Sequence, residues 1–172
     1  MRYGCLTAAG IFTLSACDEP SMLPSGGIGS EHLVLNAGAG NYSSFLIPYL
    51  GKQLHVTARL SEPRRDTKWV PLMKVCVQGA NFRDKACVNF LASRGNVGQV
   101  ESVAGYDEKT SKSRQVGTTF RIDQVMTIVI KPETKGYSVE LDGVQLYSAP
   151  TDFEVVGYAV LCSSARCEFV LS

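Results

Sequence analysis

The sequence has few of the residues on which two common kinds of function depend. Its 172 residues include only two histidines and one tryptophan, which leaves few side chains for imidazole-based catalysis. Lys and Arg number 17 and Asp and Glu number 16, so the chain lacks the positive excess typical of a nucleic-acid-binding domain. We therefore expect no nucleic-acid partner and no steering of a partner by net charge.

Long helical patterns are also missing. No stretch shows the 3.6-residue apolar period of an amphipathic helix for more than about two turns. Apolar residues make up 45% of the chain and charged residues 19%, which is enough apolar material for a folded core. The length fits one domain and a short tail.

The first residues have the layout of an export signal. Arg2 is the only charged residue before Cys17, and residues 3–16 are all apolar, small or hydroxyl-bearing. The apolar run is shorter than the roughly 20 residues that a membrane-spanning helix needs. A buried helix would show one apolar stripe, whereas this segment is apolar on all sides. We therefore predict a leader that is removed.

The end of this segment, Leu14-Ser15-Ala16-Cys17, resembles the lipobox of bacterial lipoproteins. The resemblance implies that residues 1–16 are cleaved and that Cys17 is acylated. Two or more acyl chains give a stable anchor, at about 0.8 kcal/mol per buried CH₂. We therefore expect a membrane partner through Cys17, on the periplasmic side of the inner or outer membrane. Asp18 is similar to an inner-membrane retention signal.

Residues 17–31 are predicted to form the lipidated N-terminus and a flexible tether, because residues 18–31 are rich in Pro, Gly and Ser. A folded domain is expected over residues 32–172, where apolar and polar residues alternate. Leu54, Val56, Ala58 and Leu60 give one example of this period-two pattern, which is typical of half-buried strands. The same pattern recurs at 126–130, 137–141, 153–161 and 167–171. In the run 153–161 we place Ala159 inward and Tyr158 outward.

The six cysteines agree with export. Cys5 leaves with the leader and Cys17 is taken by lipid, so four remain. An even remainder in an exported protein predicts disulfides. We predict the pairs Cys76–Cys87 and Cys162–Cys167, each across its own hairpin, with turn centres at 81–82 and 164–165. The alternative is a zinc site, but the ten-residue spacing between the first two cysteines does not fit one.

A turn signal and a family resemblance complete the fold prediction. Asp142-Gly143 between two alternating segments predicts a hairpin. Residues 125–130, 137–147 and 153–161 together resemble the C-terminal half of concanavalin-like jelly rolls of the laminin-G and galectin kind. The histidine, asparagine, tryptophan and glutamate set that galectins use for sugar is absent from the pattern. We predict an all-β antiparallel β-sandwich of the jelly-roll type, with about nine to twelve strands.

No catalytic set is found in the sequence. Glu140 and Asp142 are the only close pair of carboxylates on a strand, and jelly-roll glucanases have a third acid where this chain has Val144 and Gln145. We interpret the pair as a solvated face and a turn. No residue spacing indicates a metal site or a cofactor, and none is expected.

The expected function is therefore non-catalytic binding of a protein or a glycan at the cell envelope. The alternatives are a glycan-active enzyme of the jelly-roll type and a structural subunit of an envelope or secretion assembly. An inhibitor or immunity protein would belong to the first class. Exposed aromatic and arginine side chains commonly anchor binding sites. On that basis the candidate binding residues are Arg64, Arg65, Trp69, Tyr106 and Tyr158, although a tryptophan is more often in the core and a loop arginine more often solvated.

Overall fold

The computed structural model of the chain describes residues 31–48, 53–65, 69–81, 85–92, 95–104 and 112–172. The leader 1–16, Cys17, residues 18–30 of the tether and Tyr106 lie outside these ranges. Within them the chain forms twelve β-strands: β1 (Glu31–Asn36), β2 (Tyr42–Pro48), β3 (Leu54–Ser61), β4 (Leu72–Gln78), β5 (Lys85–Leu91), β6 (Val97–Ala104), β7 (Lys112–Arg121), β8 (Val125–Glu133), β9 (Gly136–Leu141), β10 (Val144–Pro150), β11 (Gly157–Ser163) and β12 (Arg166–Leu171).

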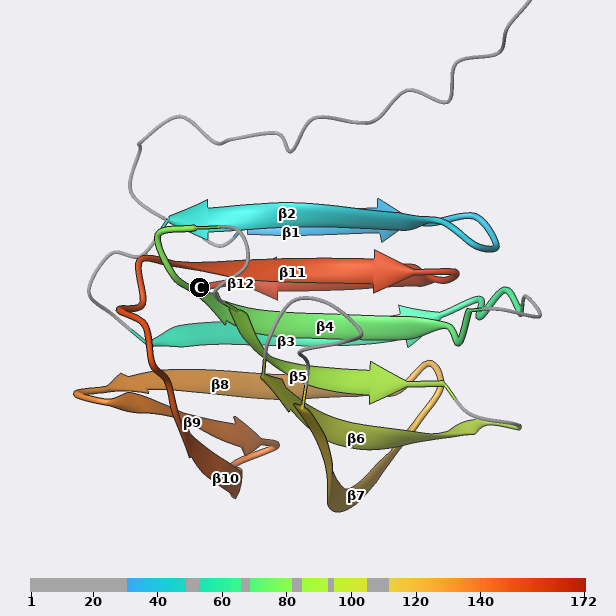
Figure 1. Ribbon diagram of the computed structural model, residues 1–172. Helices are drawn as coiled ribbons and strands as arrows, with labels where there is room; N and C mark the ends of the chain where they lie inside the picture. Colours follow the sequence, from blue (N-terminus) through green and yellow to red (C-terminus); the bar gives the residue numbers. More distant parts are fainter. Residues whose placement is uncertain (1–30, 49–52, 66–68, 82–84, 93–94, 105–111) are drawn as a thin grey trace, which may run out of the picture.

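The strands form two six-stranded antiparallel sheets that stack face to face (Figure 1). Sheet A has the order β1-β12-β3-β8-β9-β10, and sheet B has the order β2-β11-β4-β5-β6-β7. The predicted all-β sandwich is confirmed. The chain crosses between the sheets several times, but β4 to β7 follow one another within sheet B, so one continuous stretch of sequence builds two thirds of that sheet.

The core lies between the sheets and consists of the inward side chains of alternating positions. The predicted inward sets are confirmed for β3, β8, β9 and β12, because all of their members are buried. On the opposite, outward face of β3, the imidazole Nε2 of His55 is hydrogen-bonded to the side-chain amide of Gln53 at 2.6 Å.

The predicted orientation of β11 is wrong. Tyr158 is 3% exposed and belongs to the core, whereas Ala159 lies on the outer face of sheet B. Both faces of this strand are apolar, because β11 lies between β2 and β4 and its outer face is itself buried. Alternation therefore could not tell the two faces apart.

Both predicted disulfides are present, but only one closes a hairpin. Cys76 and Cys87 are direct partners in the β4–β5 register. Cys162 on β11 and Cys167 on β12 are bonded too, but these strands lie in opposite sheets. The prediction of a second hairpin was wrong because five residues of separation allow the chain to turn from one sheet to the other. The second disulfide therefore fastens sheet B to sheet A inside the core.

Two glycines hold positions that other residues would disturb. Asp142 (φ 51°) and Gly143 (φ 81°) form the predicted β9–β10 turn with positive φ at both positions, as a tight hairpin turn requires. Gly98 on β6 lies opposite Phe120 on β7, and the Phe120 ring occupies the space of the missing side chain. Phe120 also packs edge-to-face on Phe90, with ring centroids 5.6 Å apart. Gly98 therefore lets β7 close this end of the core.

Candidate functional site

The outer face of sheet B is the candidate site. The register aligns outward side chains of neighbouring strands in rows across the sheet. One row, polar except for its first member, runs through Leu161, Lys74, Asn89, Glu101 and Gln115. The next row along the strands is apolar, and the row after that is polar again. We call this surface the sheet B face.

Two amide side chains on the sheet B face are buried without a partner for one of their atoms. Gln78 on β4 is 7% exposed and Asn89 on β5 is 6% exposed. Gln78 Oε1 and Asn89 Oδ1 are inaccessible and accept no hydrogen bond. A buried acceptor without a donor costs about 1–3 kcal/mol, and such groups are few in folded proteins. The hydrogen-bonding capacity of these two oxygens is therefore unused within the chain, and a ligand would reach them only after the amide side chains turn outward.

Two lysines lie beside the amides. Lys74 is the direct cross-strand partner of Asn89, and Lys85 is the direct partner of Gln78. Burial lowers the pKa of Lys74. Burial also lowers the pKa of Lys85, and the positive charge of Lys74 lowers it further. The protein therefore holds two desolvated ammonium groups close enough to repel each other.

An apolar strip separates the two lysine–amide pairs. The Cys76–Cys87 disulfide and Ala159 form this strip, and the partly buried Leu46 packs against it. All three are at most 5% exposed although they lie outside the main core. The sheet B face thus alternates from polar to apolar to polar along the strand direction.

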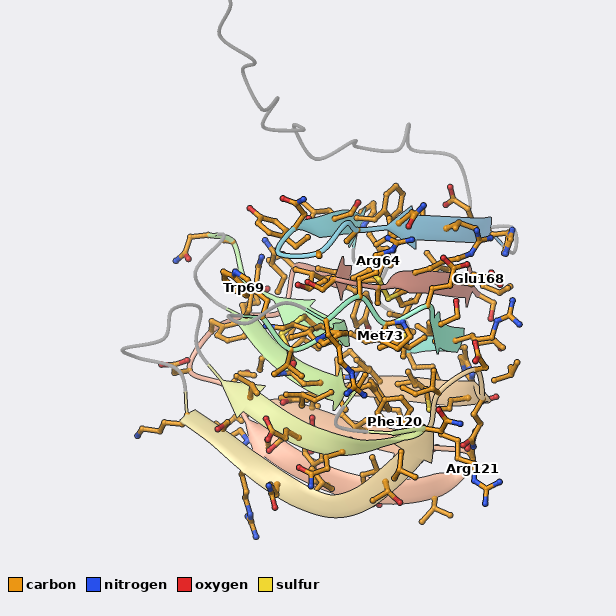
Figure 2. All side chains as sticks on the ribbon, turned by 90° about the vertical axis from the view of Figure 1, so that its right-hand side faces the viewer. Arg64, Trp69, Met73, Phe120, Arg121 and Glu168 are labelled. Atoms are coloured by element: carbon orange, nitrogen blue, oxygen red, sulfur yellow. A yellow bond between two sulfur atoms is a disulfide. The ribbon has the colours of Figure 1, made fainter. Side chains whose placement is uncertain are left out.

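An exposed aromatic residue lies at one end of this sheet. Trp69 precedes β4 and is 50% exposed, as is its neighbour Val70. Figure 2 shows Trp69 and Glu168 on opposite sides of the sandwich, with Trp69 on the side of sheet B. The prediction that a tryptophan is available for recognition is consistent with this position, and the alternative of a core residue does not hold.

The outer face of sheet A differs because it carries two clusters of paired charges. Glu168 accepts hydrogen bonds from Arg59 Nη2 at 2.7 Å and from Arg166 Nε at 3.1 Å. These bonds, the one from Arg59 first, lower the pKa of Glu168. Lys131 likewise forms an ion pair with Glu140. Charges that are already neutralised by neighbours offer less to a ligand than Lys74, which has no ion-pair partner among the described residues.

The carboxylates considered for catalysis have structural partners. Glu140 is paired with Lys131, and Asp142 Oδ1 accepts a hydrogen bond from the backbone N–H of Thr127 at 2.8 Å. Asp142 lies in the β9–β10 turn, as the sequence interpretation expected, whereas the ion pair of Glu140 with Lys131 was not predicted. Among the described residues, no group of three His, Cys, Asp or Glu side chains is arranged to hold a metal ion.

The remaining predicted binding residues are not brought together. Arg64 donates hydrogen bonds to the Ala37 carbonyl at 2.7 Å and to Glu62 Oε2 at 3.1 Å, which ties the segment after β3 to the β1–β2 turn. Arg65 is exposed and has an interaction partner. Tyr158 is in the core, so its predicted outward role is wrong. Tyr106 lies outside the described residues.

Sequence reasoning missed Lys74, Gln78, Lys85 and Asn89. A usable signal was present, because β4 and β5 place these polar residues at the outward positions around an outward cysteine. Their burial could not be read from the sequence, since it depends on neighbours that are distant along the chain. No helix in the described part of the chain has the length and apolar character needed to cross a membrane.

Comparison with known proteins gives a fold and no family. No family model matches the chain, and no curated protein matches its sequence. The carbohydrate-binding module CBM66 from Bacillus subtilis is similar in structure, with a TM-score of 0.51 and 8% identity over 78% of this chain and 82% of that one. The galectin LEC-6 from Caenorhabditis elegans has a TM-score of 0.51 and 10% identity over 82% and 95%. The homodimeric agglutinin CG-16 from chicken liver has a TM-score of 0.51 and 15% identity over 83% and 100%. The jelly-roll resemblance seen in the sequence is confirmed at the level of the fold.

Proposed function

We propose that the protein is a non-catalytic glycan-binding module, held at a bacterial membrane by lipid on Cys17. The glycan lies on the sheet B face. The single observation that best supports this proposal is the pair of buried, unpartnered oxygens, Gln78 Oε1 and Asn89 Oδ1.

Sugar hydroxyls match these oxygens. Each hydroxyl donates one hydrogen bond and accepts others, so it satisfies an amide oxygen and still accepts from a lysine. The apolar strip of the Cys76–Cys87 disulfide and Ala159 offers contact to the C–H face of a sugar ring. Trp69, half exposed beside β4, offers a stacking surface at the end of the sheet. The combination of apolar contact and a few convergent polar groups is typical of small-ligand sites.

The structural neighbours agree with a glycan partner. One is by name a carbohydrate-binding module, one a galectin and one an agglutinin. Their fold alone does not assign a function, so the proposal depends on the side chains of the sheet B face.

The non-catalytic part of the proposal is supported by the carboxylates. Glycoside hydrolysis needs two carboxyl groups flanking one bond. Glu140 and Asp142 are engaged by Lys131 and by the Thr127 N–H, and they lie on sheet A rather than on the sheet B face.

The anchor is tested by mass. We expect the protein from cells expressing the full chain to begin at Cys17, to carry fatty acyl groups and to partition into detergent. A Cys17→Ser variant should retain its starting methionine or lose the acyl mass, and it should partition into water. Recovery of wild-type protein with an unmodified sulfur at Cys17 would contradict the anchor.

The glycan site is tested with the detergent-purified protein on an array of neutral and acidic oligosaccharides. We expect Asn89→Ala to weaken retention at least tenfold. Asn36→Ala is the matched control, because Asn36 is an exposed asparagine on sheet A. Absence of any retained glycan, or equal loss in both variants, would refute the sheet B face as a glycan site.

A further inference from the structure

The arrangement around Lys74 indicates the chemical class of the glycan, given the function proposed above. Lys74 lies in the middle of the sheet B face, between Leu161 on β11 and Asn89 on β5. No described residue forms an ion pair or hydrogen bond with its ammonium group, and burial is what lowers its pKa. A desolvated cation without a counter-ion is destabilising unless a ligand supplies one.

The charges near Lys74 do not compensate it. The titratable group that interacts with Lys74 is Lys85. Both side chains are positively charged, and Lys74 lowers the pKa of Lys85 further than burial alone does. The outward carboxylate of this row is Glu101 on β6, which lies beyond Asn89. Glu101 forms no ion pair with Lys74. Lys74 therefore has no counter-ion among the described residues, and its surroundings favour an anion.

The amide oxygens add the opposite requirement. Asn89 Oδ1 beside Lys74, and Gln78 Oε1 beside Lys85, each need a hydrogen-bond donor. A simple anion such as phosphate at neutral pH brings mostly acceptors and cannot satisfy both oxygens. A neutral sugar brings donors but no charge for Lys74. A ligand with hydroxyls and a carboxylate on the same ring satisfies both requirements.

The spacing of the two pairs indicates the length of the ligand. Each pair joins adjacent strands, which lie about 4.8 Å apart. Lys74 and Gln78 are four residues apart on β4, so the pairs are separated by about 13 Å along the strands. The Cys76–Cys87 disulfide and Ala159 lie between them. This length exceeds one sugar ring and suits a short run of linked sugars.

We infer that the sheet B face binds an acidic glycan in which a uronate carboxylate contacts Lys74, sugar hydroxyls donate to Asn89 Oδ1 and Gln78 Oε1, and the rings between the two amides lie on the disulfide strip. The shared chemistry is a carboxylate on a hydroxyl-rich ring. A lipid headgroup could supply negative charge but lacks the repeated rings that the apolar strip contacts.

The test compares two forms of one polymer. Oligogalacturonate and its fully methyl-esterified form have the same rings, and only the first has carboxylates. We expect the detergent-purified protein to bind the acidic form at least tenfold more tightly, with the preference falling as salt is raised. Lys74→Met should reduce the preference to near parity. Lys135→Met, which changes an exposed lysine in the β8–β9 turn, should leave it unchanged.

The outcomes separate this inference from the proposed function. Equal binding of both forms would overturn the acidic class and leave a glycan site in place. Binding of neither form, together with an empty glycan array, would overturn the function itself. Binding to phosphatidylglycerol vesicles that depends on Lys74, without oligosaccharide binding, would show a headgroup site and overturn the inference. A melting temperature of Lys74→Met at or above that of wild type shows that lost binding is not lost folding, because burial already disfavours the ammonium form.

Discussion

At the scale of single residues, the charged side chains contribute to stability through the hydrogen bonds and ion pairs that they form. Arg64 is an arginine that the sequence offered as a binding residue and that the structure uses in part as a cross-link. Its guanidinium reaches the Ala37 carbonyl, and its backbone N–H donates to the Ser164 carbonyl at 2.6 Å. Two turns of the same end of the sandwich therefore depend on this segment.

We predict that Arg64→Ala lowers the free energy of unfolding by about 1–2 kcal/mol, because the Ala37 carbonyl loses a charged donor. Glu62→Gln should change it by less than about 0.5 kcal/mol, since the Arg64–Glu62 pair is solvent-exposed. Urea denaturation measures both variants. Equal effects of the two substitutions would assign the role of Arg64 to the ion pair instead.

Glu168 makes the stability depend on acid. The hydrogen bonds from Arg59 and Arg166 lower its pKa in the folded state below the value in the unfolded chain. A carboxylate with a lowered folded pKa stabilises the protein above the unfolded pKa, about 4.3, and loses this contribution as the pH falls through the folded pKa.

We therefore predict that Glu168→Gln lowers the melting temperature at pH 7 and that the difference from wild type shrinks toward pH 3. Glu133→Gln is the control, because Glu133 is exposed and has no ion-pair partner among the described residues. Thermal melts at several pH values test this. A difference that grows as the pH falls would have the wrong sign for the proposed cause.

At the scale of the element, two glycines are required for different reasons, one for its backbone conformation and the other for the space that a side chain would fill. Gly143 has a positive φ and open space where a side chain would be, whereas Gly98 has ordinary backbone angles and the Phe120 ring in that space. The first glycine permits the β9–β10 turn, and the second permits the contact of β6 with β7.

We predict that Gly143→Ala costs about 1–2 kcal/mol of stability, from the left-handed backbone alone. Gly98→Ala should cost about 3 kcal/mol or more, because the added carbon would meet Phe120 and lie 2.5 Å from the Leu91 carbonyl oxygen. Chemical denaturation ranks the two. The reverse order would mean that the β6–β7 contact adjusts freely.

Prediction of the elements from sequence succeeded where one face of a strand is apolar and the other polar. The inward residues of β3 and β8 follow from alternation, and the β9–β10 turn follows from Asp142-Gly143. Prediction failed for β11 because Tyr158 and Ala159 are both compatible with burial. Only the position of β11 within the sheet decides which of them faces the core.

At the scale of the whole molecule, the Cys162–Cys167 disulfide joins the two sheets. Both sulfurs lie in the main core, with 0% exposure of each residue. The Cys76–Cys87 disulfide closes a longer loop but lies within one sheet, on its outer face. Loop length and position therefore rank the two disulfides in opposite order.

We predict that the position of a disulfide in the core, rather than the length of the loop it closes, decides how much stability is lost when it is removed. Loop closure contributes about 2 kcal/mol for Cys162–Cys167 and about 3 kcal/mol for Cys76–Cys87. Replacing both members by alanine at 162 and 167 also leaves a cavity in the core, and the total loss should exceed that of the 76 and 87 double variant by at least ~1 kcal/mol. Denaturation midpoints of the two double variants decide the order, and a larger loss at 76 and 87 would favour chain entropy alone.

The sequence by itself determined the class of fold, the positions of most strands and the Cys76–Cys87 pair, because the period of two and the spacing of turns are local properties of the backbone. Tertiary structure alone decided which sheet each strand joins, and with it the route of the Cys162–Cys167 disulfide between sheets. It also decided that Lys74 is partly buried and Asn89 buried on an outer face. Burial is the sum of contacts from residues far apart in the chain, so no local pattern of polar and apolar residues records it.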